Sequence, residues 1–141
     1  MRVVFDTVVF VRSLLNPYSQ AGKLVFAYAD GYALVLSEPV VREILEVLQR
    51  PEISRKIRAV AEMDMGKLLD LFSQAELVEP TAIPSVCRDA NDDKFLATAV
   101  AGGVDVIVSA DKDMLDLEVY QGIVIVDMAA FLGMLEAGAH D

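Results

Sequence analysis

The chain has 141 residues and is 55% hydrophobic, which is enough to bury one substantial core and suits a single domain spanning residues 1–141. Its 22 acidic residues against 12 lysines and arginines give a formal net charge of −10, which by itself argues against binding nucleic acid through phosphate contacts. The apolar stretches are too short for the ~20 residues of a membrane span, no signal peptide precedes the first segment, and the single cysteine, Cys87, has no disulfide partner, so we expect a cytoplasmic protein that does not bind membranes.

Strand-like and helix-like segments alternate from end to end, which predicts an α/β fold. The five expected strands are short and mostly β-branched, as strands buried on both faces are, so the sheet should be mainly parallel. The last few residues should form a flexible tail. In chain order we expect a strand at 2–5, helices at 8–15 and 21–29, a strand at 33–36, helices at 38–49, 53–60 and 65–75, a strand at 76–78, a helix at 92–101, strands at 104–108 and 123–126, and a helix at 128–137.

Local signals mark several helix ends. Asp64 and Asp127 precede apolar-periodic segments, where a carboxylate caps free backbone N–H groups. Three glycines are placed to end helices: Gly31, Gly102 and Gly138. These signals agree with the alternation of strands and helices.

Three aspartates stand where strands should end or helices begin. Asp6 follows the strand at 2–5, Asp92 opens the helix at 92–101, and Asp111 follows the apolar segment 106–110. Ligands bind α/β folds at the carboxyl edge of the sheet, and acids that gather there repel one another unless a cation neutralises them. The pattern therefore predicts a site for a hard divalent metal such as Mg²⁺. For Asp6 and Asp92 the alternative is helix capping alone.

Glu43 is the fourth candidate ligand. It lies outside the polar stripe of the helix at 38–49, at the edge of the apolar arc, and should point away from the solvated face. The alternative is a boundary glutamate whose carboxylate reaches water.

Four further residues are secondary candidates for the site. Asp93 is one of them, but Asp92 is predicted to be the inward acid of this pair, because it shares a helical face with apolar residues while Asp93 and Lys94 turn elsewhere. Ser109 would donate a hydrogen bond to a carboxylate or phosphate, and its alternative is turn chemistry. The secondary candidates are Asp89, Asp93, Asp113 and Ser109.

If the four acids converge, a reaction class follows. One or two Mg²⁺ or Mn²⁺ ions would activate a water for in-line attack on a phosphodiester, a step that needs no protein nucleophile. The lack of a usable histidine is compatible with this reaction, since the single histidine, His140, lies at the chain end, where order is usually low.

Five basic residues between 42 and 58 predict a local basic patch despite the net charge: Arg42, Arg50, Arg55, Lys56 and Arg58.

Four segments form an ordered set of motifs. They are VVFDT at 3–7, LSEPVVREI at 36–44 with LQRP at 48–51, DANDDKFLATA at 89–99, and VSADKDML at 108–115. With these motifs the chain resembles the PIN-domain family, and within it the toxin-like branch related to VapC-type ribonucleases of prokaryotic toxin–antitoxin systems. The resemblance spans nearly the whole chain.

The resemblance implies a three-layer α/β/α domain with a parallel sheet of about five strands. Such a domain cleaves single-stranded or structured RNA with Mg²⁺ or Mn²⁺, is often a homodimer, and is silenced by a cognate antitoxin protein that covers the acidic groove. The family's acids map onto Asp6, Glu43, Asp92 and Asp111, the last sometimes joined by a neighbour such as Asp113.

The chain departs from the family pattern at two positions. Val8 stands where the family commonly has the asparagine of Asp-Thr-Asn, which removes an amide that would help to orient the site. Ser109 stands where threonine is usual, and it keeps the hydroxyl. All four carboxylates remain, so the loss of the amide bears on catalytic rate more than on metal binding.

Three alternative functions are weighed against a nuclease. A haloacid-dehalogenase-type phosphatase needs a second aspartate where this chain has Val8. A phospho-accepting receiver domain needs an acidic pair after the first strand and an aspartate after a central strand, whereas Asp6 stands alone and the strand at 33–36 is followed by Ser37. A catalytically weak or inactive PIN-like scaffold that binds a partner protein or RNA stays open.

Overall fold

A six-stranded sheet organises the chain. The computed structural model describes residues 1–60, 62–81, 87 and 89–138, with the backbone alone at 58–60 and 62–64. The strand order is β3-β2-β1-β4-β6-β5, and every neighbouring pair is parallel except the antiparallel pair β5 and β6. The strands are β1 (Arg2–Phe5), β2 (Ala33–Ser37), β3 (Glu76–Val78), β4 (Val106–Val108), β5 (Val119–Tyr120) and β6 (Ile123–Val126).

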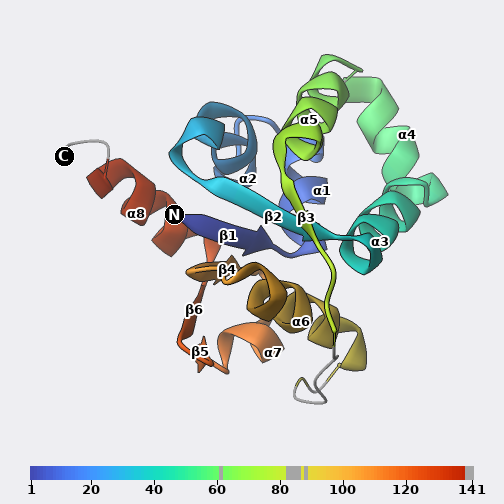
Figure 1. Cartoon of the computed structure of the whole chain (residues 1–141). Coiled ribbons are helices and arrows are strands. Elements are labelled where there is room, and N and C mark those ends of the chain that lie inside the picture. Colours follow the sequence, from blue (N-terminus) through green and yellow to red (C-terminus); the bar gives the residue numbers. More distant parts are fainter. Residues whose placement is uncertain (61, 82–86, 88, 139–141) are drawn as a thin grey trace.

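Helices cover both faces of this sheet, as Figure 1 shows. The helices α1 to α5 lie on one side, and α6 and α7 lie on the other, where α6 packs against β1, β2, β3 and β4. The three-layer α/β/α prediction is therefore confirmed. The α-helices are α1 (Thr7–Leu15), α2 (Gln20–Gly22), α3 (Glu38–Leu48), α4 (Pro51–Val60), α5 (Glu62–Gln74), α6 (Asp93–Gly102), α7 (Lys112–Leu115) and α8 (Met128–Gly138).

The first strand is buried on both faces, as its sequence predicts. Val3, Val4 and Phe5 are completely inaccessible to solvent. The ring of Phe5 packs against Tyr32 and Phe131, with ring centroids 5.1 Å and 5.9 Å apart. Burial of these side chains stabilises the fold by roughly 1.5–3 kcal/mol each. The residue that follows this strand, Asp6, is thereby fixed at a rigid position.

The expected helix at 21–29 is wrong in part. The segment begins as α2 but continues as a π-helical turn, η1 (Lys23–Ala27), and a 3₁₀ turn, η2 (Ala29–Gly31). The Tyr28 N–H bonds the Lys23 carbonyl at 2.9 Å, and the Tyr32 hydroxyl donates to the Leu24 carbonyl at 2.7 Å. A side chain that bonds a helix carbonyl from outside interrupts the regular helical ladder.

The sheet has one strand more than the five expected. β5 is two residues long and pairs with β6 through a two-residue turn at Gln121 and Gly122, whose φ angles are 49° and 80°. Positive φ at both positions is typical of a tight hairpin turn. The strand expected at 104–108 is also shorter, because β4 begins at Val106. A strand of two residues has too little alternation to be recognised from the sequence.

The predicted helix ends are met at several positions. Asp127 caps α8, since its Oδ1 accepts from the Ala130 N–H at 2.7 Å. Gly31 ends the 3₁₀ turn and Gly138 is the last residue of α8. Gly102 is the last residue of α6, and Gly103 takes the left-handed conformation with φ of 56°. The Asp64 side chain, for which a cap is predicted, lies outside the described residues.

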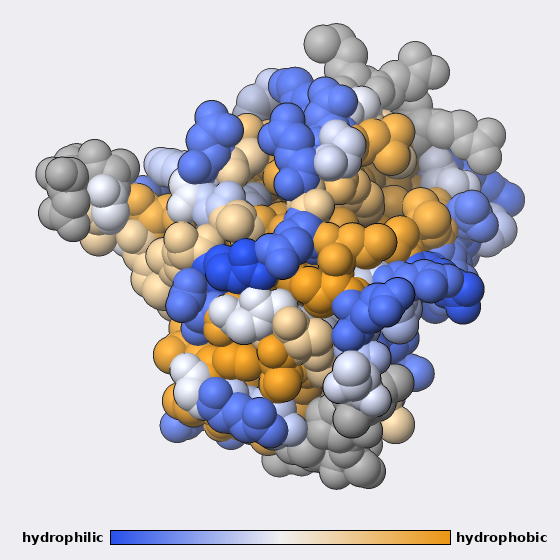
Figure 2. Space-filling model, in the orientation of Figure 1, coloured by the Kyte–Doolittle hydropathy of each residue, from blue (hydrophilic) through white to orange (hydrophobic). Residues whose placement is uncertain are grey.

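The outer strands carry exposed apolar side chains. Leu77 on β3 is 69% exposed, and Val119 on β5 and Val124 on β6 are also exposed. Figure 2 shows hydrophobic surface on this face of the molecule, between strongly hydrophilic groups. In the described part of the chain, no helix has the length and apolar character that crossing a membrane requires.

The strand order creates one crevice where ligands bind such sheets. From β1 the chain moves outward through β2 to β3, then returns on the other side of β1 as β4. The reversal lies between β1 and β4, and in open α/β sheets the crevice beyond the carboxyl ends of two such strands is the usual ligand site. Asp6 follows β1, and Ser109, Ala110 and Asp111 follow β4.

Candidate active site

Asp6 is the buried anchor of this crevice. Its side chain caps α1 through the Val9 N–H at 3.2 Å and reaches the neighbouring strand end, where it accepts from the Ser109 hydroxyl at 2.6 Å and from the Ala110 N–H at 2.9 Å. The residue is 5% exposed. Burial raises the pKa of Asp6, the three hydrogen bonds oppose that rise, and the charge of Asp111 adds to it. The capping alternative is therefore true of Asp6, but the same carboxylate also faces the crevice residues of β4.

Asp92 holds the most unusual oxygen of the site. Its Oδ2 is buried and, within the part of the chain that the structure describes, has no hydrogen-bond partner. Burial is the first cause that raises the pKa of Asp92 to about 7, followed by a side-chain hydrogen bond to Asp111, which requires a shared proton, and by the charges of Asp111, Asp89 and Glu43. A buried carboxylate oxygen without a donor is costly unless a proton or a cation satisfies it.

Asp111 links the two preceding residues. It lies at the start of α7, where its Oδ1 accepts from the Asp113 N–H at 3.0 Å, and its own N–H donates to the Ser109 hydroxyl at 3.0 Å. Its charge raises the pKa of both Asp6 and Asp92. Because such effects require proximity, Asp6, Asp111 and Asp92 lie together at one rim of the sheet.

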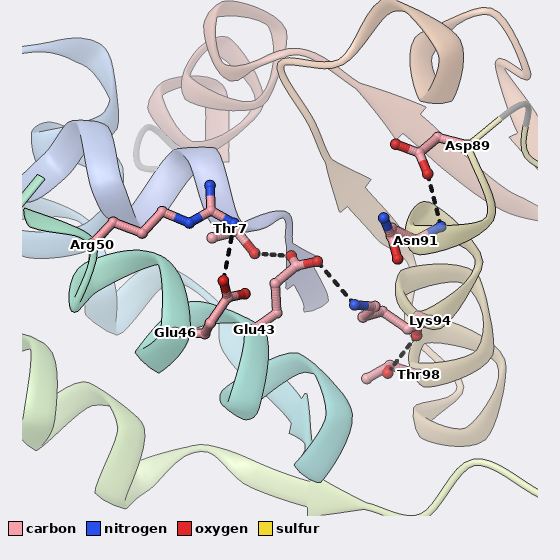
Figure 3. Close-up of polar contacts among 8 residues, drawn as sticks. All are labelled: Thr7, Glu43, Glu46, Arg50, Asp89, Asn91, Lys94 and Thr98. Carbon is pink, nitrogen blue, oxygen red and sulfur yellow. Dashed lines mark hydrogen bonds and ion pairs between the residues drawn. The ribbon is translucent and has the colours of Figure 1, made fainter. Parts of the chain in front are cut away.

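Glu43 extends from α3 toward Thr7 and Lys94, as Figure 3 shows. Its Oε1 pairs with the Lys94 ammonium at 2.9 Å, and its Oε2 accepts a hydrogen bond from the Thr7 hydroxyl. Its side chain is 20% exposed, so its predicted position away from the solvated face is confirmed. Its charge contributes to the raised pKa of Asp92. We call Asp6, Glu43, Asp92 and Asp111 the acidic cluster.

A cleft of about 620 Å³ opens beside the acidic cluster, between α3 and α6. Ion pairs one helical turn apart line its α3 wall: Arg42 with Glu38, and Arg50 with Glu46 at 3.1 Å. Arg42 and Arg50 of the expected basic patch each pair with a glutamate, so this wall carries no net positive charge. Arg55 and Lys56 are exposed on α4, and the Arg58 side chain lies outside the described residues. The residues that line the cleft are Glu38, Pro39, Arg42, Glu43, Glu46, Arg50, Asn91 and Lys94.

The prediction that Asp92 is the inward acid of its pair is wrong. Asp93 is 4% exposed and accepts from the Cys87 N–H at 2.7 Å, whereas Asp92 is half-buried at the rim. The reason is that the α-helix begins at Asp93, and Asp92 closes a 3₁₀ turn, η3 (Ala90–Asp92), which rotates it from the helical register assumed. In this position Asp92 lies close to Asp111, whose charge raises its pKa.

The remaining secondary candidates occupy supporting positions. The exposed Asp89 caps η3 through the Asn91 N–H, and its charge acts on Asp92. Ser109 is fully buried and donates to Asp6, so it orients a cluster carboxylate. Asp113 is half-buried on the first turn of α7. The valine that replaces the family's usual asparagine, Val8, is 38% exposed.

Two residues of the site were missed by reasoning from the sequence. Lys94 was expected to turn elsewhere but contacts Glu43, and Thr7 contacts the same carboxylate. Both stand within the recognised motifs, next to Asp6 and two positions after Asp92. Their partner is 36 residues away for Thr7 and 51 for Lys94, so helical periodicity carried no signal for either contact.

The donor set of the acidic cluster suits a hard divalent cation. All four members supply carboxylate oxygen, which Mg²⁺ and Mn²⁺ prefer, and one buried oxygen of Asp92 has no partner in the part of the chain that the structure describes. Within the described residues, no three acids, histidines or cysteines already stand at ligand distances. Asp6 and Glu43 already have partners in the chain: Asp6 accepts from the Ser109 hydroxyl and the Ala110 N–H, and Glu43 pairs with the Lys94 ammonium.

The raised pKa of Asp92 predicts a pH-dependent stability. Its folded pKa of about 7 exceeds its ordinary 3.8, so between these values the metal-free native state holds a proton that the unfolded chain releases. Stability should therefore fall as pH rises through this window and stop falling above it. Urea unfolding with a chelator present measures this, with Asp92→Asn as the reference. The free energy of unfolding of the wild type minus that of the variant should decrease between about pH 4 and 7. A difference that stays constant over this range would contradict the raised pKa of Asp92.

Comparison with known proteins agrees with this architecture. Residues 2–113 match the family model described as PIN domain. An uncharacterized protein of Methanocaldococcus jannaschii, MJ1680, is 31% identical over 119 residues, which cover 83% of this chain and 75% of that protein. A chain from the crystal structure of VapBC2 from Rickettsia felis bound to a DNA fragment from their promoter has the same fold, with a TM-score of 0.57, 12% identity, and coverage of 90% of this chain and 98% of that one. The family model and the archaeal relative together show that the chain belongs to the PIN-domain family.

Proposed function

We propose that the protein is an endoribonuclease that hydrolyses RNA phosphodiester bonds with Mg²⁺ or Mn²⁺. PIN domains are generally nucleases, which supports a hydrolase at the level of reaction class. The proposal rests on the buried Oδ2 of Asp92, which has no hydrogen-bond partner among the described residues and lies close to Asp111 at the crevice between β1 and β4. The four proposed catalytic and metal-binding residues are Asp6, Glu43, Asp92 and Asp111, and the secondary candidates keep the supporting roles that their contacts suggest.

The chain's own residues would divide the work as their contacts indicate. Asp92 and Asp111 would supply the most available oxygens, while Asp6, held by Ser109 and two backbone N–H groups, would supply a rigid one. A divalent ion bound there lowers the pKa of water and stabilises charge on phosphate oxygens. The cleft between α3 and α6 would receive the RNA backbone.

A place in a toxin–antitoxin pair is the second element of the proposal. It is supported by the fold shared with a chain of VapBC2 from Rickettsia felis. In this proposal a cognate antitoxin protein would cover the acidic groove and block access to the cleft. A homodimer stays a prediction, to be checked by light scattering. The alternative, a scaffold that binds protein or RNA without cleaving it, is favoured by Val8, which offers no amide to orient the site.

Thermal melting with and without Mn²⁺ is the first test. At a concentration 100 times the dissociation constant, one bound ion should stabilise the native state by about 2.7 kcal/mol, which raises the melting temperature by about 8 °C. Asp111→Asn should lose most of this shift. The matched control is Asp30→Asn, an exposed aspartate before β2, which should keep it.

A cleavage assay separates the nuclease from the scaffold. A nuclease should cut single-stranded RNA in Mn²⁺, and the activity should be lost in Asp111→Asn and retained in Asp30→Asn. A protein that Mn²⁺ stabilises but that leaves RNA intact would favour the scaffold. A protein that Mn²⁺ does not stabilise would refute the metal site itself.

A further inference from the structure

Glu43 is already neutralised by a cation from its own chain. The Lys94 ammonium lies 2.9 Å from Oε1, the Thr7 hydroxyl bonds Oε2, and the paired side chains are only 22% and 20% exposed. Within the acidic cluster this contrasts with Asp92, whose Oδ2 is buried and has no partner in the described chain. Glu43 is therefore the cluster member whose carboxylate is paired with a cation, so a metal ion that binds Glu43 has to compete with Lys94.

Lys94 differs in this respect from the other cations of the cleft. Arg42 and Arg50 pair with glutamates one turn away on α3, and these pairs are independent of the acidic cluster. Lys94 comes from α6 and pairs across the cleft with a cluster residue. Of the three cations that line the cleft, Lys94 alone is therefore coupled through its carboxylate partner to occupancy of the metal site.

Metal binding to Glu43 would change the net charge of the cleft. Among the described residues that line the cleft, three cations, Arg42, Arg50 and Lys94, face three carboxylates, Glu38, Glu43 and Glu46, and these six charges cancel. If the Glu43 carboxylate is committed to a metal ion, the lining has one cation in excess. A cation in a cleft beside carboxylates suits a phosphate of an RNA backbone.

We propose that Lys94 is a positioning residue for the RNA phosphate. In the metal-free protein Lys94 is paired with Glu43, and metal binding to Glu43 frees the Lys94 ammonium to bind the phosphate. The proposal rests on the proposed metal-dependent function and deepens it. It makes metal ion and RNA cooperative ligands, because each favours the arrangement in which Glu43 and Lys94 are apart.

The test uses Lys94→Met, which keeps most of the side-chain volume and removes the charge. Calorimetric titration of the full chain with Mn²⁺ should give an affinity about 2- to 5-fold tighter than that of the wild type, because Glu43 no longer has a competing partner. Fluorescence anisotropy with a phosphorothioate single-stranded RNA should show the opposite effect, an affinity in Mn²⁺ that is about 5-fold weaker. A merely structural role would not raise the affinity for the metal ion while lowering that for RNA.

Two further variants complete the design. Arg42→Met removes a cleft cation without touching Glu43, so it should weaken RNA binding equally with and without Mn²⁺ and leave Mn²⁺ affinity unchanged. Lys94→Arg should restore RNA binding in Mn²⁺, which excludes a folding defect as the cause of the Lys94→Met result. If the wild type binds Mn²⁺ but Lys94→Met has an unchanged or weaker affinity for Mn²⁺, or an unchanged affinity for RNA, the role of Lys94 is overturned. That result would leave the proposed metal site intact. Wild-type protein that binds no Mn²⁺ would overturn this inference and the proposed metal site together.

Discussion

Replacement of Asp92 by asparagine should lower kcat/KM for RNA cleavage by at least about 100-fold. Loss of a residue that merely supports a metal ligand typically costs 10–100-fold, and Asp92 is proposed to be a ligand itself, so the upper end of that range is the minimum expected here. The amide keeps the shape of the side chain but lacks its charge. Cleavage of a labelled single-stranded RNA in Mn²⁺ measures the effect.

The same variant should not lose stability in the absence of metal. The Asp92 carboxylate is disfavoured by burial and by the charges of Asp111, Asp89 and Glu43, so its neutral replacement should melt at the same or a higher temperature at pH 8. Asp30→Asn is the control for both measurements, because it removes an exposed carboxylate far from the crevice. Activity within tenfold of the wild type would refute Asp92 as a ligand. A large fall in melting temperature would instead indicate a structural role.

Replacement of Asp6 by alanine should lower the free energy of unfolding by about 3 kcal/mol or more. The change leaves three donors without their acceptor, the N–H groups of Val9 and Ala110 and the Ser109 hydroxyl. Each unsatisfied donor in a buried position costs roughly 1–3 kcal/mol, and water that enters the space recovers part of the sum. Urea unfolding in a chelator gives the value without a contribution from metal binding.

Asp127→Ala is the matched control for this effect. Asp127 also caps a helix, but it is exposed, and its side chain accepts from the Ala130 N–H of that helix. Loss of such a cap costs about 1 kcal/mol. The difference between the two variants in the loss of unfolding free energy therefore measures the hydrogen bonds that join Asp6 to the residues after β4. If Asp6→Ala costs no more than Asp127→Ala, the carboxylate acts as a helix cap alone.

Patterns among neighbouring residues were enough to predict the fold class and to select the acidic residues that follow strands. Val3, Val4 and Phe5 form an apolar segment followed at once by an acid, and both the buried strand and the position of Asp6 at its carboxyl end follow from these neighbours. The same is true of Asp111 after β4. Residue propensity did not predict β5, which pairs with β6, or the π-helical turn, whose Leu24 carbonyl accepts from the Tyr32 hydroxyl.

The sequence by itself determined a mainly parallel α/β sheet and the placement of carboxylates beside its strand and helix ends, because periodicity and capping act between residues a few positions apart. The tertiary structure decided which atoms of the site are engaged and which are available. Ser109 reaches Asp6 across 103 residues, Lys94 reaches Glu43 across 51, and no described residue donates to the Oδ2 of Asp92. The first contact depends on the pairing of β1 with β4 and the second on the packing of α3 against α6, and local sequence encodes neither of these long-range arrangements.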